Sequence, residues 1–294
     1  MGRCTIRRVT RRRARHPALA LPRPQVFAHR GGALLRPENT ILAFDHGMSL
    51  GADGLEFDVH LSRDGEVVVH HDATLERTTN GRGPLSALTA DELARLDAGY
   101  WFTTHSGPPS PAESSPASAG HAAEHPFRGV AGGVPRLEEV LRRYPTATCI
   151  IELKVNEPEL AHRTVDVVRA AGAVDRVALG SFGRRVLRAA RAYEPRLLTG
   201  AAREETRLAL YRSWVRWPVK HPPYDAYQVP ETAGSTRVVS PRFVRYAHDT
   251  GLAVQVWTVN EKADMLRLLD WGVNAIISDR PDIAVEVVRH RHEL

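Results

Sequence analysis

The sequence has little cysteine, little lysine and no long apolar run. Its two cysteines, Cys4 and Cys149, are too few for a disulfide framework or a cysteine-rich metal cluster, and such usage favours a reducing, cytoplasmic location. No apolar run approaches the ~18–20 residues that cross a bilayer, so no stable membrane insertion is expected. With 43% hydrophobic residues among 294, the chain can still bury an ordinary globular core.

The formal net charge of +6 comes from the start of the chain. Residues 1–23 contain eight arginines and no acidic residue, so the remainder carries about −2. A chain without a basic excess beyond its first residues does not favour nucleic-acid binding. The arginines resemble the start of an export signal, but the apolar segment at 18–21 is too short for one. Residues 1–24 are therefore predicted to form a disordered basic tail.

Short apolar runs alternate with helix-like segments from residue 25 onwards, which predicts parallel strands joined by crossover helices. No glycine-rich dinucleotide turn follows the first run, which disfavours an open, doubly wound sheet. Eight parallel strands in a chain of this length predict an α/β fold of the closed (β/α)8 TIM-barrel type. The expected strands are residues 25–29, 54–58, 148–154, 177–182, 196–201, 226–229, 253–258 and 275–278.

One insertion is expected after the second strand, over residues 59–136, on the C-terminal face where such barrels keep their chemistry. It would hold a hairpin, a helix beginning near residue 86, and a flexible loop at 103–133 that is rich in Pro, Ser and Ala. The whole barrel is predicted to span residues 25–285, with a helix end at 286–294.

The hairpin at the start of this insertion predicts which of two adjacent histidines faces the barrel. An Asp-Gly pair between Arg63 and Glu66 is typical of a two-residue turn. If Arg63 faces Glu66, Asp58 lies opposite His71, and directly opposed residues share a face. His71 is therefore expected beside Asp58, and His70 is expected to look away.

Acidic residues lie at the ends of two predicted strands. Glu56 and Asp58 alternate with apolar residues, so a strand turns both to the same face. Glu152 shares a face with Lys154 in the same way. Three carboxylates at one barrel mouth repel each other unless a cation lies between them, and hard cations prefer oxygen ligands. Zinc is less favoured, because oxygen ligands predominate and no cysteine is near.

Several motifs occur in an order that resembles the glycerophosphodiester phosphodiesterase family, over roughly residues 25–285. They are His29-Arg30-Gly31, Pro37-Glu38-Asn39-Thr40, Glu56-Phe57-Asp58, the run from Ser62 to Gly65, His71-Asp72, the run from Leu75 to Gly81, the run from Ile151 to Lys154, the run from Val256 to Asn260, and the run from Ile277 to Pro281.

The resemblance implies an enzyme, a phosphoric diester hydrolase that converts glycerophosphodiesters to glycerol 3-phosphate and an alcohol. It implies a Mg²⁺ or Ca²⁺ ion held by Glu56, Asp58 and Glu152. His29 and His71 are the candidates for general acid and base, because imidazole titrates near neutral pH. Which histidine is the acid stays open. So does the choice between direct attack by water and prior attack by a glycerol hydroxyl.

Further residues are candidates for substrate binding. Arg30 can grip two phosphate oxygens, and Lys154 supplies a point charge. Glu38 would meet the glycerol hydroxyls or orient Arg30; the alternative is an ordinary acid in the first turn of a helix. Trp257 resembles the family's aromatic wall beside the glycerol, and Phe182 is a second candidate for the pocket; the alternative for Trp257 is an ordinary core position in a barrel strand.

Two other functions stay open. A lysophospholipase D acting on lysophospholipids would need an apolar groove for one acyl chain, and no amphipathic membrane-facing helix is evident in the sequence. A non-catalytic, phosphate-binding barrel is disfavoured because the full set of catalytic candidates is present. The expected partner is a small-molecule substrate, in a monomer or small homo-oligomer. Arg77 is expected to be structural.

Overall fold

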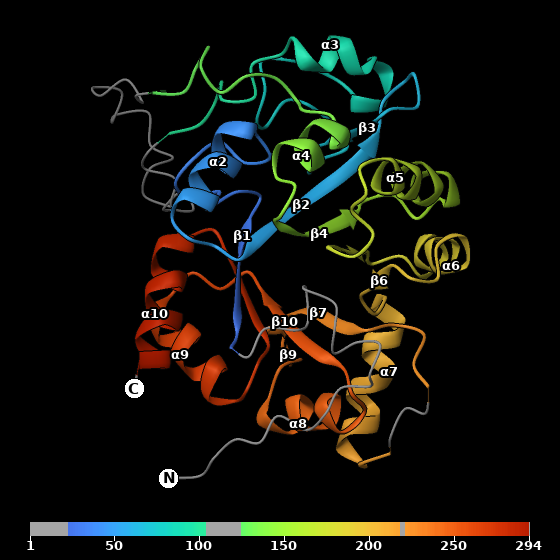
Figure 1. Cartoon of the computed structure of the whole chain (residues 1–294), viewed down its shortest axis with the longest axis vertical. Coiled ribbons are helices and arrows are strands. Elements are labelled where there is room, and N and C mark those ends of the chain that lie inside the picture. Colours follow the sequence, from blue (N-terminus) through green and yellow to red (C-terminus); the bar gives the residue numbers. More distant parts are fainter. Residues whose placement is uncertain (1–22, 104–124, 218–220, 294) are drawn as a thin grey trace.

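The computed structural model describes residues 23–103, 125–217 and 221–293. The predicted basic tail falls outside these residues, apart from 23 and 24, as does most of the predicted loop at 103–133. Eight parallel strands carry the fold (Figure 1). They are β1 (Gln25–His29), β2 (Gly54–Leu61), β4 (Thr148–Leu153), β5 (Val177–Gly180), β6 (Leu198–Thr199), β7 (Ala226–Pro230), β10 (Ala253–Trp257) and β11 (Ala275–Ser278).

The strands follow the order β6-β5-β4-β2-β1-β11-β10-β7. A parallel bridge between Gly200 and Ala226 brings the last strand back to the first, so the sheet is a nearly closed barrel. The predicted TIM-barrel fold is thereby confirmed. Four predicted strands are shorter than expected. Strands β4 and β10 each end one residue early, β5 ends at Gly180, and β6 comprises only Leu198 and Thr199.

Helices surround the barrel. They are α2 (Ile41–Ser49), α4 (Leu137–Arg143), α5 (Pro158–Ala170), α6 (Arg184–Tyr193), α7 (Arg203–Trp214), α8 (Pro241–Asp249), α9 (Lys262–Asp270) and α10 (Pro281–Glu293). Helix α2 begins where the Thr40 side chain accepts a hydrogen bond from the Ala43 N–H, which is a standard N-cap. Among the described residues, none of the helices has the length and apolar composition needed to cross a membrane.

Strand alternation divides the core in two and places the site. Phe27 and Ile150 belong to a small cluster inside the barrel, whereas Phe57 and Ile151 pack in the large cluster between sheet and helices. Because side chains alternate along a strand, the inward position after Ile150 is Glu152. By the same alternation, the inward-facing side chains at the ends of β1, β2 and β11 lie inside the barrel mouth.

The insertion contains β3 (Val67–Val69), a short 3₁₀ helix η2 (Leu85–Ala87) and α3 (Ala90–Ala94). Strand β3 pairs antiparallel with β2, as expected for the hairpin. The helix predicted near residue 86 is shorter than expected, because it forms as these two brief pieces. Helix α3 starts with a capping box in which Thr89 and Glu92 each satisfy the other's backbone.

The predicted register of the hairpin is wrong by one residue. Val59 pairs with Val69, so Asp58 lies opposite His70, whose backbone N–H donates to the Asp58 carbonyl at 3.0 Å. The cause is a three-residue turn in place of the two-residue turn, with Gly65 in the left-handed region at φ +79°. A second difference lies near β7, where β8 (Thr232–Ala233) and β9 (Thr236–Arg237) form a small hairpin that the sequence did not suggest.

Candidate active site

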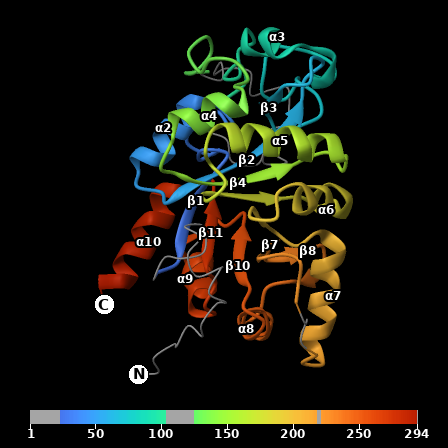
Figure 2. The ribbon, with the colours of Figure 1, turned by 45° about the vertical axis from the view of Figure 1, so that its right-hand side comes forward.

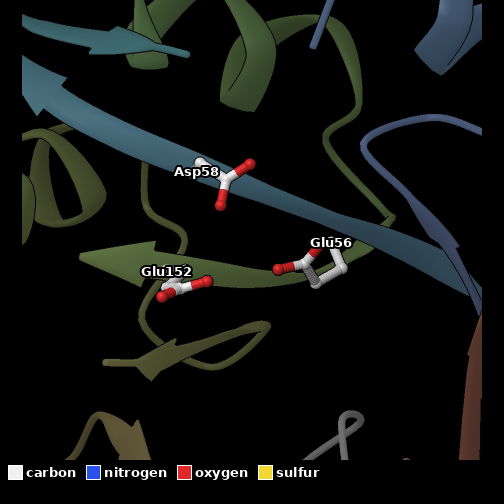
Figure 3. A group of neighbouring side chains, drawn as sticks. All are labelled: Glu56, Asp58 and Glu152. Carbon is white, nitrogen blue, oxygen red and sulfur yellow. The ribbon is translucent and has the colours of Figure 1, made fainter. Parts of the chain in front are cut away.

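Three carboxylates converge at the barrel mouth, as Figure 3 shows. Glu56 and Asp58 project from β2 and Glu152 from β4, and one oxygen from each lies within 4.8 Å of the others. Strand pairing explains the convergence, since Asp58 and Glu152 are direct partners in the parallel ladder. The structure thus brings together the three residues expected to hold a cation.

The electrostatics of this cluster favour a bound cation. Burial, together with the neighbouring carboxylates, raises the pKa of Glu56 even though His29 opposes the shift. Burial also raises the pKa of Glu152. Among the described residues, Glu56 Oε2 is a buried oxygen without a hydrogen-bond donor. A buried acceptor without a partner is costly, so an oxygen-preferring divalent cation fits this donor set.

Two cationic side chains adjoin the same cluster. Lys154 Nζ lies 3.4 Å from Asp58 Oδ1 and 3.4 Å from Glu152 Oε2, and Arg30 Nε lies 3.2 Å from Asp58 Oδ2. Burial alone would raise the pKa of Asp58, but Arg30 and Lys154 outweigh it and hold that pKa below its usual value. Asn39 donates to Asp58 Oδ2 at 3.0 Å. Asp58 therefore stays ionised.

Arg30 keeps an unused donor at the mouth. Its Nε–H points at no acceptor with hydrogen-bond geometry among the described residues, although Nη1 donates to Glu38 Oε1 at 3.0 Å. Both Arg30 (φ 50°) and Asn39 (φ 58°) have left-handed backbones. Such conformations cost energy in residues other than glycine and cluster at functional sites.

His29 is held at the end of β1 by a residue from the far end of the chain. Its Nδ1 lies 2.6 Å from Asp279 Oδ1, and Asn260 donates to Asp279 Oδ2 at 3.0 Å. The other ring nitrogen, Nε2, is 3.7 Å from Glu56 Oε2. Burial lowers the pKa of His29, but the hydrogen bond to Asp279 and the charge of Glu56 outweigh it, so the pKa is raised.

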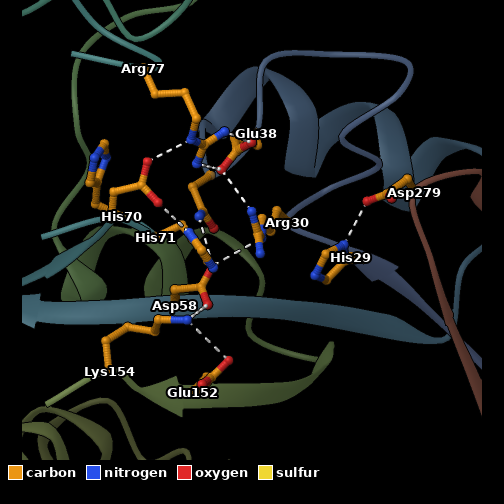
Figure 4. A network of polar contacts seen from close by, with 12 residues as sticks. His29, Arg30, Glu38, Asp58, His70, His71, Arg77, Glu152, Lys154 and Asp279 are labelled. Atoms are coloured by element: carbon orange, nitrogen blue, oxygen red, sulfur yellow. Dashed lines mark hydrogen bonds and ion pairs between the residues drawn. The ribbon is translucent and has the colours of Figure 1, made fainter. Parts of the chain in front are cut away.

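His71 is held in a similar way on the opposite side of Asp58 (Figure 4). Its Nδ1 lies 2.5 Å from Asp72 Oδ1, and burial lowers its pKa. His70 instead hydrogen-bonds the Thr74 carbonyl at 3.1 Å. The structure therefore brings His71 to the site despite the shifted register, because both histidines lie beyond the end of β3, where strand alternation no longer applies.

Arg77 lies between Glu38 and Asp72 and joins them. Its guanidinium grips both oxygens of Glu38 at 2.7 Å and reaches Asp72 Oδ2 at 2.5 Å. Burial would raise the pKa of Glu38, but Arg77 and Arg30 lower it to about 2. The chain of contacts from His71 through Asp72, Arg77 and Glu38 to Arg30 links the insertion to the barrel.

Sequence reasoning did not single out four of these residues, which are Asn39, Asp72, Asn260 and Asp279. Each lies in one of the motifs that carry the family resemblance, so a signal was present. What the sequence could not supply was the pairing of each residue, since His29 and Asp279 are 250 positions apart.

The aromatic candidates lie together beside the carboxylates. The rings of Phe182 and Trp257 meet edge to face at 5.8 Å between centroids, and Arg203 stacks over Phe182 at 4.8 Å. Both aromatic residues line a cavity of about 440 Å³ that Glu56 and Glu152 also line. Every site residue expected from the sequence therefore lies at this end of the barrel.

Comparisons with known proteins all find the same family. The model of the glycerophosphoryl diester phosphodiesterase family matches residues 29–283. A glycerophosphodiester phosphodiesterase of Caldanaerobacter subterraneus subsp. tengcongensis is 29% identical over 269 residues, which cover 90% of this chain and 97% of that protein. A glycerophosphodiester phosphodiesterase of Bacillus subtilis is 30% identical over 265 residues, covering 87% of this chain and 83% of that protein.

Solved structures are similar as well. The crystal structure of a glycerophosphodiester phosphodiesterase from Agrobacterium tumefaciens has a TM-score of 0.69 at 26% identity, and the match covers 90% of this chain and 99% of that one. An Oleispira antarctica phosphodiesterase, solved in complex with the product sn-glycerol-3-phosphate, has a TM-score of 0.68 at 24% identity, and the match covers 91% of this chain and 97% of that one. The latter similarity shows the shared fold.

Proposed function

The chain belongs to the glycerophosphoryl diester phosphodiesterase family and is an enzyme of that class, and from this premise we propose which of its residues carry out each part of the reaction. The reaction is the hydrolysis of a glycerophosphodiester to glycerol 3-phosphate and an alcohol. The proposal has two parts, which are a divalent cation on the carboxylate cluster and proton transfer by two histidines.

One observation supports the bound cation. A buried oxygen of Glu56 has no hydrogen-bond donor among the described residues, although two further carboxylates lie near it. Glu56, Asp58 and Glu152 would hold Mg²⁺ or Ca²⁺, both of which take oxygen ligands. Once bound, such an ion supplies positive charge to a phosphate oxygen. Lys154 already neutralises part of the cluster and would lie beside the same phosphate.

The two histidines are suited to proton transfer because each is fixed through Nδ1 by a carboxylate. Asp279 holds His29, and Asp72 holds His71, so in both neutral rings the proton sits on Nδ1 and the lone pair on Nε2. One histidine accepts the proton of the nucleophile and the other protonates the leaving oxygen. A carboxylate also stabilises the imidazolium formed during the reaction.

Substrate binding is assigned to the remaining candidates. Arg30 offers its unused Nε–H to a phosphate oxygen, while Glu38 holds its guanidinium in place. Trp257 and Phe182 would form the apolar wall beside the glycerol. Electrostatic stabilisation of the charged transition state by Arg30 and Lys154 is then the main contribution of the protein's own cations.

The test is a substrate screen followed by phosphorus NMR. The purified chain is given glycerophosphocholine, glycerophosphoethanolamine and glycerophosphoglycerol, with Mg²⁺ or Ca²⁺ present. We expect glycerol 3-phosphate as the phosphorus-containing product of at least one diester. A chain that cleaves none of the three, or one that releases phosphocholine or phosphoethanolamine together with free glycerol, would contradict the proposed function.

A further inference from the structure

Arg77 lies on a turn that is fixed by packing within the insertion. Figure 1 and Figure 2 both show the insertion, marked by β3 and α3, at the end of the molecule opposite α8. Leu75, which precedes Arg77 by two residues, is fully buried in a small cluster that also holds Leu85. Thr79, two residues after Arg77, is fully buried as well, and its hydroxyl donates to the Leu75 carbonyl at 2.8 Å. The backbone on both sides of Arg77 is therefore held by contacts of the insertion itself.

The side chain of Arg77 ends between two carboxylates, as Figure 4 shows. Its Nε donates to Asp72 Oδ2 at 2.5 Å, whereas Nη1 and Nη2 donate to the two oxygens of Glu38 at 2.7 Å each. Every guanidinium nitrogen thus has a carboxylate acceptor. An effect of Arg77 on the reaction therefore passes through Asp72 and Glu38 and not through direct contact with the substrate.

Each of these carboxylates holds one residue to which the proposed function gives a role. The other oxygen of Asp72, Oδ1, lies 2.5 Å from His71 Nδ1. Glu38 Oε1 also accepts a hydrogen bond from Arg30 Nη1 at 3.0 Å. Because a guanidinium is planar and rigid, it fixes the distance between the two carboxylates that it joins. The placement of His71 is thereby tied to the placement of Arg30.

The same contacts keep both carboxylates ionised. Burial would raise the pKa of Asp72, but the hydrogen bonds from Arg77 and His71 outweigh it and lower that pKa. Burial would likewise raise the pKa of Glu38, but Arg77 and Arg30 lower it to about 2. An ionised carboxylate accepts shorter and stronger hydrogen bonds than a neutral acid does. Both carboxylates can therefore hold their partners firmly in one orientation.

We propose that Arg77 is a positioning residue of the reaction, which aligns His71 with Arg30 by holding the carboxylate partner of each. The inference rests on the proposed function, since that function assigns proton transfer to His71 and phosphate binding to Arg30. The insertion then carries one group of the active site and aligns it with a group of the barrel. The alternative is an ion pair that only attaches the insertion to the barrel, which would affect stability and not the reaction.

A substitution that preserves the charge separates these two roles. Arg77→Lys keeps the positive charge, but an ammonium is a point charge and cannot span two carboxylates as a guanidinium does. With the glycerophosphodiester that the native enzyme cleaves fastest, kcat should fall about 10- to 100-fold, which is the range typical for losing a hydrogen-bond partner behind a residue of a metal site. KM should rise, because Arg30 also binds the phosphate of the bound substrate. An attachment role predicts a lower melting temperature with native kcat and KM.

Chemical rescue gives a second readout. The Arg77 side chain is 48% exposed, so Arg77→Ala leaves a gap that is open to solvent. Guanidinium, added well below denaturing concentrations, should restore the kcat of this variant several-fold, because the planar ion can again bridge Asp72 and Glu38. Methylammonium at the same concentration has the same charge without the planar fork and should restore less.

Arg63→Ala is the matched control. Arg63 is also an arginine of the insertion, 54% exposed, and it donates to Glu92 Oε2 at 3.0 Å, in a contact that involves no residue assigned to the reaction. This variant should keep native kcat and KM, and guanidinium should not raise its kcat. Circular dichroism checks that each variant is folded.

The outcomes separate failure of this inference from failure of the proposed function. If Arg77→Lys and Arg77→Ala keep native kcat and KM while His71→Ala loses activity, Arg77 serves attachment alone and the proposed function stands. Equal rescue of Arg77→Ala by guanidinium and by methylammonium would also overturn the inference, because charge and not geometry would then matter. Native activity of His71→Ala would remove the proton-transfer role of that histidine, and the inference with it.

Discussion

Replacing Asp279 by asparagine tests how His29 is held. The carboxylate lies 2.6 Å from His29 Nδ1, and the asparagine amide has the same size and can still accept a hydrogen bond. What changes is the charge. A hydrogen bond to a charged group is worth about 1.5–3 kcal/mol and one between neutral groups about 0.5–1.5, so roughly 1–1.5 kcal/mol is lost. Because 1.36 kcal/mol is a factor of ten, kcat should fall roughly tenfold, with less change in KM.

The pH dependence gives the same variant a second readout. In the native protein the pKa of His29 is raised, because its hydrogen bond to Asp279 and the charge of Glu56 outweigh burial. Removing the charge of Asp279 lowers that pKa. The limb of the kcat profile governed by His29 should therefore move to lower pH. A merely structural role for Asp279 would reduce the amount of folded enzyme and leave the profile where it was.

Asp282→Asn is the matched control, because Asp282 pairs with Arg280 at 2.8 Å in a contact that does not involve His29. It should keep native kcat and native pH dependence. The reasoning fails if Asp279→Asn is as active as the native enzyme at every pH, because His29 would then need no carboxylate partner or transfer no proton.

Four further variants test other parts of the structure. His71→Ala should lower kcat by ~10²–10⁴ in a choline-release assay, as for loss of a general acid or base, whereas His70→Ala should act mainly on the melting temperature. Glu38→Gln should lower the melting temperature at pH 7, because Arg77 holds the pKa of Glu38 near 2 against the effect of burial. The depressed pKa stabilises the fold above the ordinary glutamate pKa, so this deficit should shrink as the pH falls from about 4.5 towards 2. Phe57→Ala should cost ~3–5 kcal/mol in denaturant unfolding, because its fully buried ring leaves a cavity.

The barrel could be predicted from the sequence because its signal is local and repeated. Each apolar run marks a strand, and strand alternation assigns inward and outward positions without knowledge of the neighbours. That rule put Glu56 and Asp58 on one face of the second strand, and Glu152 and Lys154 on one face of the third. The structure confirms that these three meet, because parallel strands end at the same side of a barrel.

The remainder depends on contacts that no local pattern encodes. The hairpin register failed because a three-residue turn replaced the expected Asp-Gly turn, and one residue of slip reverses every face. His71 still lies near Asp58, because it is past the paired part of β3. The contact between His29 and Asp279 joins β1 to the residue after β11, and the small hairpin of β8 and β9 was not evident in the sequence.

The most direct test of the central claim is a metal titration of the chain after treatment with EDTA. The carboxylate cluster predicts that one equivalent of Mg²⁺ or Ca²⁺ binds, restores turnover of a glycerophosphodiester and raises the melting temperature, since a ligand of the native state stabilises it by about 2.7 kcal/mol at 100 times its Kd. Glu56→Gln should weaken the binding and lose the activity together. Full turnover in excess EDTA, with no change in melting temperature on adding either ion, would contradict the account.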